Sequence, residues 1–172
     1  AQGGVVFDRE PYLQEDGKTV SVHLECDRMS LKVRPEGVPD RLGLDGNVVA
    51  VLHERPASAP KPTVKQLLCD SLFVSFGPGS NLVAQAEATG TVLIRQQDRS
   101  ARANHAQYSD STGKLVLTGN PVITLPEGTI SGATEVSWEP AASRYTVSGK
   151  FLSRWKRLPL STNLSDLTTR KP

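Results

Sequence analysis

Residues 101–122, ARANHAQYSDSTGKLVLTGNPV, contain both of the patterns that decide the fold of this chain. The first pattern starts at Ala103-Asn104 and reads small residue, short polar residue, any residue, apolar residue. The second is Leu117-Thr118-Gly119-Asn120-Pro121-Val122, in which a glycine stands between apolar residues. Residues 110–113 (DSTG) separate the two patterns and have the composition of a turn. The stretch therefore predicts two strands joined by a turn, with an interruption inside each strand.

Both patterns recur along the chain. The small-residue pattern begins at Cys26, Cys69, Ala103 and Ala133, and the glycine pattern is centred on Gly46, Gly90, Gly119 and Gly149. Around the first copy the inward-facing positions change parity, from Val22 and Leu24 before it to Met29 and Leu31 after it. A change of parity within one strand requires an extra residue, which forms a bulge or a corner. Glycine inside a strand is also unfavourable unless a corner uses it, so we expect these residues to be structural corners.

The alternation of the two patterns predicts an all-β fold. We expect a folded-over antiparallel meander of repeated strand-corner-strand units, forming a β-jelly roll that is open along one side. The alternative is a plain β-sandwich in which the glycines mark ordinary hairpin turns. A chain of 172 residues is long enough for one domain with a core. We assign that domain to residues 1–156, with an exposed Pro-rich loop at 55–62, and expect residues 157–172 to form a polar, disordered tail.

Composition and motifs argue against several classes of function. The net charge of +2 is too small to predict nucleic-acid binding, and no run of about 18 apolar residues is present to span a membrane. No nucleophile elbow or phosphate loop occurs, so we expect neither catalysis nor a cofactor. His23 has the opposite strand parity to Cys26, and no CxxC or HExxH motif occurs, so no metal site is expected. Cys26 and Cys69 should lie two strand spacings apart, roughly 9.5 Å, and are predicted to be unbridged.

The opening stretch also carries a family resemblance. Residues 101–108 and 113–122 resemble OstA-like domains, in which a strand of the form A-x-A-x-x-A-x-Y is followed by L-x-L-x-G-N-P-V. The resemblance is specific over residues 84–150 and looser over 20–55, and it departs from the family at the Pro-rich loop and at two cysteines where alanine is common. It implies a β-taco domain like those of LptA and LptC in the lipopolysaccharide transport bridge. The soluble bridge fits a single domain best, with the membrane-anchored component and the periplasmic domain of the translocon as alternatives.

The resemblance further implies a periplasmic protein whose signal or anchor has been removed. Its inner groove would hold the acyl chains of lipopolysaccharide (lipid A) during transport to the outer membrane. Each methylene left in water costs about 0.8 kcal/mol, so an aliphatic groove suits this cargo. The candidate lining residues are the inward-facing positions Val22, Leu24, Leu31, Leu72, Val74, Phe76, Val92, Ile94, Leu115, Leu117, Ile123, Val136, Trp138 and Phe151. For each of them the alternative is a place in a closed core.

The ends of such a meander leave two unpaired edges, which invite strand addition. We expect the N-terminal edge at residues 5–7 or 20–24, and the C-terminal edge at residues 146–152. Head-to-tail pairing with further copies, or with other β-jelly-roll transport components, would follow. The basic segment 154–157 either covers an edge, contacts lipid phosphates or is an ordinary solvated run. Two other functions compete: a carbohydrate-binding or adhesive sandwich, and an assembly module that carries no lipid.

Overall fold

The computed structural model describes residues 4–13, 17–56, 62–80, 82–139, 142 and 144–156. Most of the Pro-rich loop expected at 55–62, and all of the tail expected at 157–172, lie outside these residues. Within them the chain forms β1 (Val5–Leu13), β2 (Thr19–Cys26), β3 (Arg28–Val33), β4 (Pro39–Arg55), β5 (Thr63–Phe76), β6 (Val83–Gln96), β7 (Arg99–Ser109), β8 (Lys114–Thr118), β9 (Val122–Leu125), β10 (Gly128–Ser131), β11 (Glu135–Glu139), β12 (Arg144–Ser148) and β13 (Leu152–Trp155).

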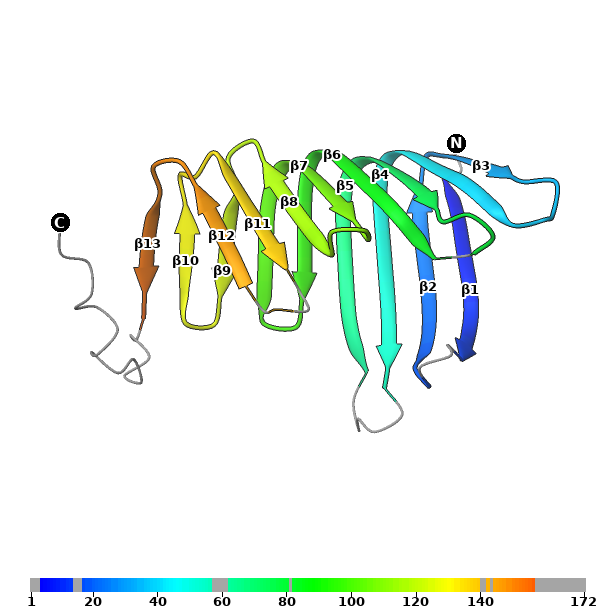
Figure 1. Cartoon of the computed structure of the whole chain (residues 1–172), viewed down its shortest axis with the longest axis horizontal. Helices are drawn as coiled ribbons and strands as arrows, with labels where there is room; N and C mark the ends of the chain where they lie inside the picture. Colours follow the sequence, from blue (N-terminus) through cyan, green and yellow to red (C-terminus); the bar gives the residue numbers. More distant parts are fainter. Residues whose placement is uncertain are drawn as a thin grey trace.

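These strands make one antiparallel sheet that folds over on itself into two layers (Figure 1). On one side of the fold, strand pairing gives the first layer, β1-β2-β4-β5-β6-β7-β9-β10-β13. On the other side it gives the second layer, β3-β4-β5-β6-β7-β8-β11-β12. In Figure 1 the N-terminal strand β1 (blue) and the C-terminal strand β13 (orange) lie at opposite ends of the molecule. The predicted all-β, folded-over antiparallel meander is therefore confirmed.

Only the central strands run through the fold without a break. β4, β5, β6 and β7 contribute residues to both layers, whereas elsewhere the corner separates two shorter strands, as between β2 and β3. The ladders of the long strands shift register at the fold, for example between Asp45 and Val48 of β4. Across this shift the inward-facing positions of β5 change parity, from Leu72 and Val74 on one side to Cys69 and Leu67 on the other, whereas the glycine-bearing β4 keeps one parity from Leu42 to Ala50. The parity change that the sequence contained therefore belongs to the strands with the small-residue pattern.

Each corner brings a glycine of one pattern against the short polar residue of the other. The glycines have positive φ values, +75° at Gly46, +93° at Gly90, +73° at Gly119 and +90° at Gly149, which side-chain-bearing residues rarely adopt. A Cβ on these glycines would overlap, in the same order, Asp27, Asp70, Asn104 and Thr134. Backbone hydrogen bonds join two of these pairs, from Asp27 N to Gly46 O and from Asn104 N to Gly119 O, both at 2.9 Å. The two patterns are therefore the two halves of one corner, rather than separate corners.

The core follows the crease between the layers. The small residues Cys26, Cys69, Ala103 and Ala133 are all buried there. The largest fully buried apolar side chains are Leu44, Val48, Val92, Leu117 and Val136. Both cysteines are free, as the strand spacing predicted. The closed edge of the sheet is thus packed tightly, and space for a ligand between the two layers lies toward the open edge.

Candidate functional site: the interior groove

Cross-strand partners in a β-ladder share a face, so the register identifies the residues between the two layers. In the second layer one unbroken row contains Leu31, Leu42, Val74, Ala86, Tyr108, Leu115, Trp138 and Tyr145. In the first layer the matching row contains Phe7, Leu24, Ala50, Leu67, Ile94, Ala101, Ile123 and Ile130. Every side chain in the two rows is aliphatic or aromatic. We call the space between them the interior groove.

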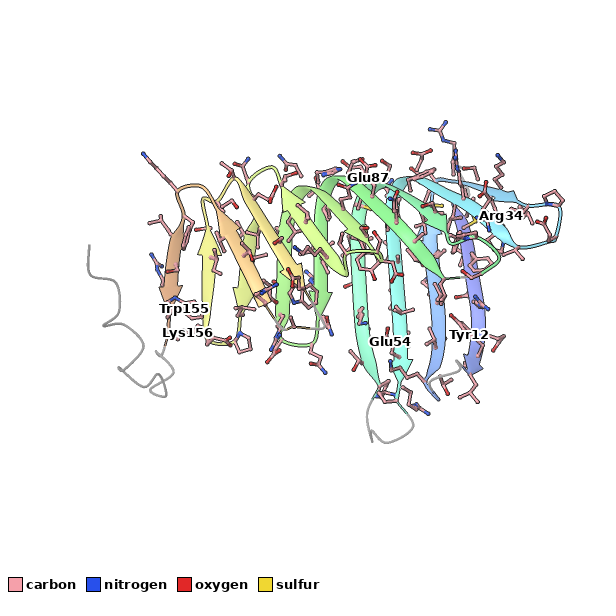
Figure 2. All side chains as sticks on the ribbon, in the orientation of Figure 1. Tyr12, Arg34, Glu54, Glu87, Trp155 and Lys156 are labelled. Atoms are coloured by element: carbon pink, nitrogen blue, oxygen red, sulfur yellow. The ribbon has the colours of Figure 1, made fainter. Side chains whose placement is uncertain are left out.

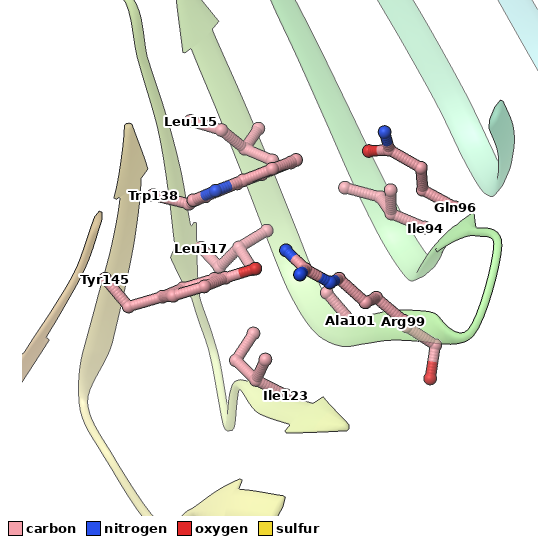
Figure 3. A pocket seen from close by; sticks show the side chains of 10 residues that line it. Ile94, Gln96, Arg99, Ala101, Leu115, Leu117, Ile123, Trp138 and Tyr145 are labelled. Atoms are coloured by element: carbon pink, nitrogen blue, oxygen red, sulfur yellow. The ribbon is translucent and has the colours of Figure 1, made fainter. Parts of the chain in front are cut away.

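At the C-terminal half the two rows meet across a narrow cleft (Figure 3). Trp138 and Tyr145 stack with ring centroids 5.8 Å apart and form one wall. The cavity volume is about 30 Å³, which is room for about one water molecule. We call this the interlayer cleft; its lining residues are Ile94, Gln96, Arg99, Ser100, Ala101, Leu115, Leu117, Ile123, Trp138 and Tyr145. The layers are thus almost in contact here, and a chain-like ligand would have to separate them.

A second, wider hollow lies on the inner face of the first layer. Its volume is about 220 Å³, and its walls come from β2, β4, β5 and β6. Val22, Leu52 and Leu67 are among its apolar lining residues. Ile94 lines both this hollow and the interlayer cleft. The two spaces are therefore adjacent parts of one apolar path along the groove.

The predicted lining residues fall into three groups. Leu24, Leu72, Val74, Val92, Leu117, Ile123 and Val136 are buried in the core. Val22, Phe76, Ile94 and Leu115 are partly buried against that core, and Trp138 lines the interlayer cleft. Leu31 and Phe151 differ from the expectation, with 54% and 49% of their surface exposed. Leu31 lies in the inner row but on β3, which pairs only with β4, whereas Phe151 lies between β12 and β13.

Sequence reasoning missed several residues of the groove. Tyr145 lies directly opposite Trp138 in the β11–β12 ladder, and Arg99 lies opposite Gln96 in the β6–β7 ladder. The signal for Tyr145 is its two-residue alternation with Val147, which lies in the edge predicted at residues 146–152. Arg99 carried no such signal, because an inward-facing cation near a turn has the same local pattern as an outward-facing one.

Charge is distributed unevenly along the open edge of the first layer. Lys65 Nζ lies 2.9 Å from the carboxylate of Glu54, which neutralises it (Figure 2 labels Glu54 on β4). Arg99 has no acidic partner among the described residues. The indole N–H of Trp138 is buried without a hydrogen-bond acceptor in the same part of the chain. An unsatisfied buried donor costs about 1–3 kcal/mol, so this side of the cleft has unused capacity to bind an acceptor.

A polar clamp centred on Arg34 lies at the N-terminal end of the groove. Arg34 donates hydrogen bonds to the carbonyl oxygens of Phe76 and Gly77 at 2.9 and 2.8 Å, and it pairs with Asp40 at 3.1 Å. Figure 2 shows Arg34 at this end of the molecule, next to β3. The clamp joins the β3–β4 turn to the β5–β6 turn. It therefore fixes edge strand β3, whose inward-facing Leu31 is exposed.

Outside the groove, the outer face of the first layer carries a polar cluster. His23 lies between two carboxylates, with Nδ1 at 2.5 Å from Asp8 Oδ1 and Nε2 at 2.9 Å from Glu25 Oε1. The hydrogen bond with Asp8, followed by that with Glu25, raises the pKa of His23 above its ordinary value of 6.5. His23 faces away from Cys26, as its parity predicted. In the described residues no group of three or more histidine, cysteine, aspartate or glutamate side chains is arranged to hold a metal ion.

These features define a class of protein: a two-layer β-taco whose open side gives access to an apolar interior, with edge strands at both ends. The model of a family described as "LptA/(LptD N-terminal domain) LPS transport protein" matches residues 24–137. Because the match spans well over half of the chain, the protein belongs to this family of lipopolysaccharide transport proteins. No curated protein matches the sequence. No helix in the described part of the chain is long and apolar enough to cross a membrane.

A solved structure has the same fold. It is the crystal structure of LptH, described as the LptA-homologous periplasmic component of the conserved lipopolysaccharide transport device of Pseudomonas aeruginosa. The two chains superpose with a TM-score of 0.55 at 10% sequence identity, covering 80% of this chain and 95% of LptH. Similarity at this low identity establishes the common fold, and the residues of the groove have to be argued from this chain itself.

Proposed function

We propose that this protein is a non-catalytic periplasmic bridge component that holds the acyl chains of lipopolysaccharide in its interior groove. The observation that carries the proposal is the pair of apolar cross-strand rows, which extend from β1 and β3 at one end to β10 and β12 at the other. Burying a methylene is favourable by about 0.8 kcal/mol, and rows with no charged side chain let an acyl chain slide without breaking ion pairs.

The ends of the molecule support assembly into a longer path. Within the described residues, β1 and β3 are unpaired on their outer sides at the N-terminal end, and β12 and β13 are unpaired on their outer sides at the C-terminal end. The alternative N-terminal edge at residues 20–24 is excluded, because β2 lies between β1 and β4. Arg154 and Trp155 of the basic segment lie in the end strand β13, where Trp155 packs over Gly128, and Arg157 lies outside the described residues. Head-to-tail pairing of these edges would join the grooves of successive domains.

The test is photo-crosslinking of purified protein to lipopolysaccharide from residues at the wide hollow. A photoreactive residue at Leu67 or Ile94 faces the groove, whereas one at the adjacent Leu68 or Leu93 faces outward on the same two strands. Adducts from the first pair and none from the second are expected. Val92 is a poorer probe site because it is only 1% exposed, and a bulky group there would disturb the core. Adducts equal on both faces, or absent from Leu67 and Ile94 in folded protein, would refute the groove.

One observation favours a second candidate function. The interlayer cleft of about 30 Å³ is too small for an acyl chain, as expected for a module that assembles through its edges and carries no lipid. The two candidates differ in one respect that can be measured. A lipid carrier must widen this cleft when cargo enters, whereas an assembly module keeps the cleft closed in every state.

A further inference from the structure

We propose that Arg99 and the indole N–H of Trp138 together bind a phosphate group carried by a lipid whose acyl chain lies in the interior groove. This inference rests on the proposed function and adds to it a place at which the head group is recognised. The site would lie at the mouth of the interlayer cleft, between Arg99 on β7 and Trp138 on β11 (Figure 3).

Arg99 is the unneutralised cation of this mouth. It has the same strand parity as Ala101 and Ala103, which face the interior, so its stem starts on the inner face of the first layer. Gln96 lies opposite it in the ladder, and Lys65 lies opposite Gln96 on the next strand. Lys65 is paired with Glu54 at 2.9 Å, whereas Arg99 has no acidic partner in the described residues. On the inner face of β5, β6 and β7, the electrostatic attraction for an anion is therefore concentrated at Arg99.

Trp138 provides the second donor from the opposite layer. Its indole ring stacks on Tyr145 with an interplanar angle of 6°, which fixes the ring plane. Its buried N–H has no acceptor in the described part of the chain. In Figure 3 the two aromatic rings stand on one side of the cleft, and Arg99 and Gln96 stand on the other. A ligand entering between the layers would thus meet donors from both.

The chemistry of these donors selects a phosphate. A guanidinium binds two oxygens of a phosphate or carboxylate through parallel hydrogen bonds. A carboxylate bound to Arg99 through both oxygens would offer the indole only the remaining lone pairs of those same oxygens, and a neutral sugar would leave the guanidinium uncompensated. A phosphate monoester has a third terminal oxygen for the indole. The apolar residues beneath the donors, Ile94, Leu117 and Ile123, suit the hydrocarbon part of the same molecule.

Access to the site requires a local opening that the topology permits. β11 and β12 are the last two strands of the second layer, and in the described residues they are attached to β8 by a four-residue register and by an ion pair between Lys114 and Glu139 at 3.1 Å. Displacing this hairpin moves Trp138 and Tyr145 together and breaks no pairing within the first layer. Binding should therefore change the surroundings of Trp138 directly.

The test uses the fluorescence of Trp138. The chain has two tryptophans, so Trp155→Phe leaves Trp138 as the single fluorophore. The protein is titrated with bisphosphorylated lipid A, with the same lipid after removal of both phosphates, and with inorganic phosphate. Arg99→Gln in this background should weaken binding of the phosphorylated lipid by about tenfold or more and leave the phosphate-free lipid unchanged. Arg102→Gln, which removes a cation from the outer face of the same strand, is the matched control and should change neither.

The outcomes separate this inference from the proposed function. If Arg99→Gln binds the phosphorylated lipid as tightly as its parent, or weakens both lipids equally, phosphate recognition is refuted while the lipid groove stands. If inorganic phosphate alone gives the full Arg99-dependent signal, the site binds free anions, and a lipid-borne phosphate is refuted. If neither lipid changes Trp138 fluorescence and neither crosslinks at Ile94, the proposed function fails together with the inference.

Discussion

Replacing Gly90 by alanine is the sharpest test of the corner geometry. Gly90 has φ of +93°, and a Cβ there would lie 2.5 Å from Asp70 Cβ and still closer to the carboxylate. The unfavourable φ costs about 1–2 kcal/mol for an L side chain. Moving Asp70 away also weakens the hydrogen bond from Thr91 N to its carboxylate at 3.3 Å, which is worth about 1 kcal/mol. We therefore expect Gly90→Ala to lower the free energy of unfolding by about 3 kcal/mol.

A matched control separates backbone strain from steric overlap. Gly113 also has positive φ, +61°, but a Cβ there meets nothing within 4 Å. Gly113→Ala should therefore lower the free energy of unfolding only by the cost of the unfavourable φ, about 1 kcal/mol. Urea denaturation followed by far-ultraviolet circular dichroism gives both values. In the double variant Asp70→Gly/Gly90→Ala, the loss in free energy of unfolding should be about 1 kcal/mol smaller than the sum of the losses in the two single variants, because the two residues are in contact.

Two results would refute the reasoning. If Gly90→Ala costs no more than Gly113→Ala, overlap with Asp70 does not matter and the two patterns do not form one corner. If the Asp70 and Gly90 variants are additive, the contact between them carries no energy. Either result would return the glycines to the role of ordinary turn residues.

Three further predictions concern the core, the N-terminal edge and the cysteines. Leu117→Ala removes a side chain that is 1% exposed, and it should lower the free energy of unfolding in urea by about 3 kcal/mol. The control Val116→Ala, at an outward-facing position, should lower it by less than about 1 kcal/mol. Equal losses would contradict the assignment of the two faces of β8. Because the pKa of His23 is raised, protonated His23 should stabilise the pairing of β1 fully below about pH 6.5, and this contribution should be lost as the pH rises through the raised pKa. Hydrogen exchange of the β1 amides, corrected for intrinsic rates, should therefore be slower at pH 6 than at pH 8.5. The variant His23→Gln should abolish this difference. Burial raises the pKa of Cys69 to about 11, so its thiol should be alkylated at pH 8 far more slowly in the native protein than in urea, and rapid native labelling would contradict its burial.

The corners could be predicted from the sequence because their causes are local. A positive φ favours glycine at that single position, and a parity change is visible over a few positions on either side of Cys26 or Cys69. Most inward-facing residues, such as Val92 and Leu117, followed from the same two-residue period. These preferences act within a single strand, so one sequence is enough to detect them.

What the sequence left open depends on which strands become neighbours. Leu31 lies in the same inward-facing row as Val74, yet it is exposed because β3 is an edge strand. The contact between Gly90 and Asp70, like the stacking of Trp138 on Tyr145, joins residues from different strands. The sequence by itself determined where each strand bends and which face is apolar, since backbone conformation and alternation are local properties. Only the tertiary structure decided which residues meet across the groove, because burial and pairing arise when distant strands close the two layers on each other.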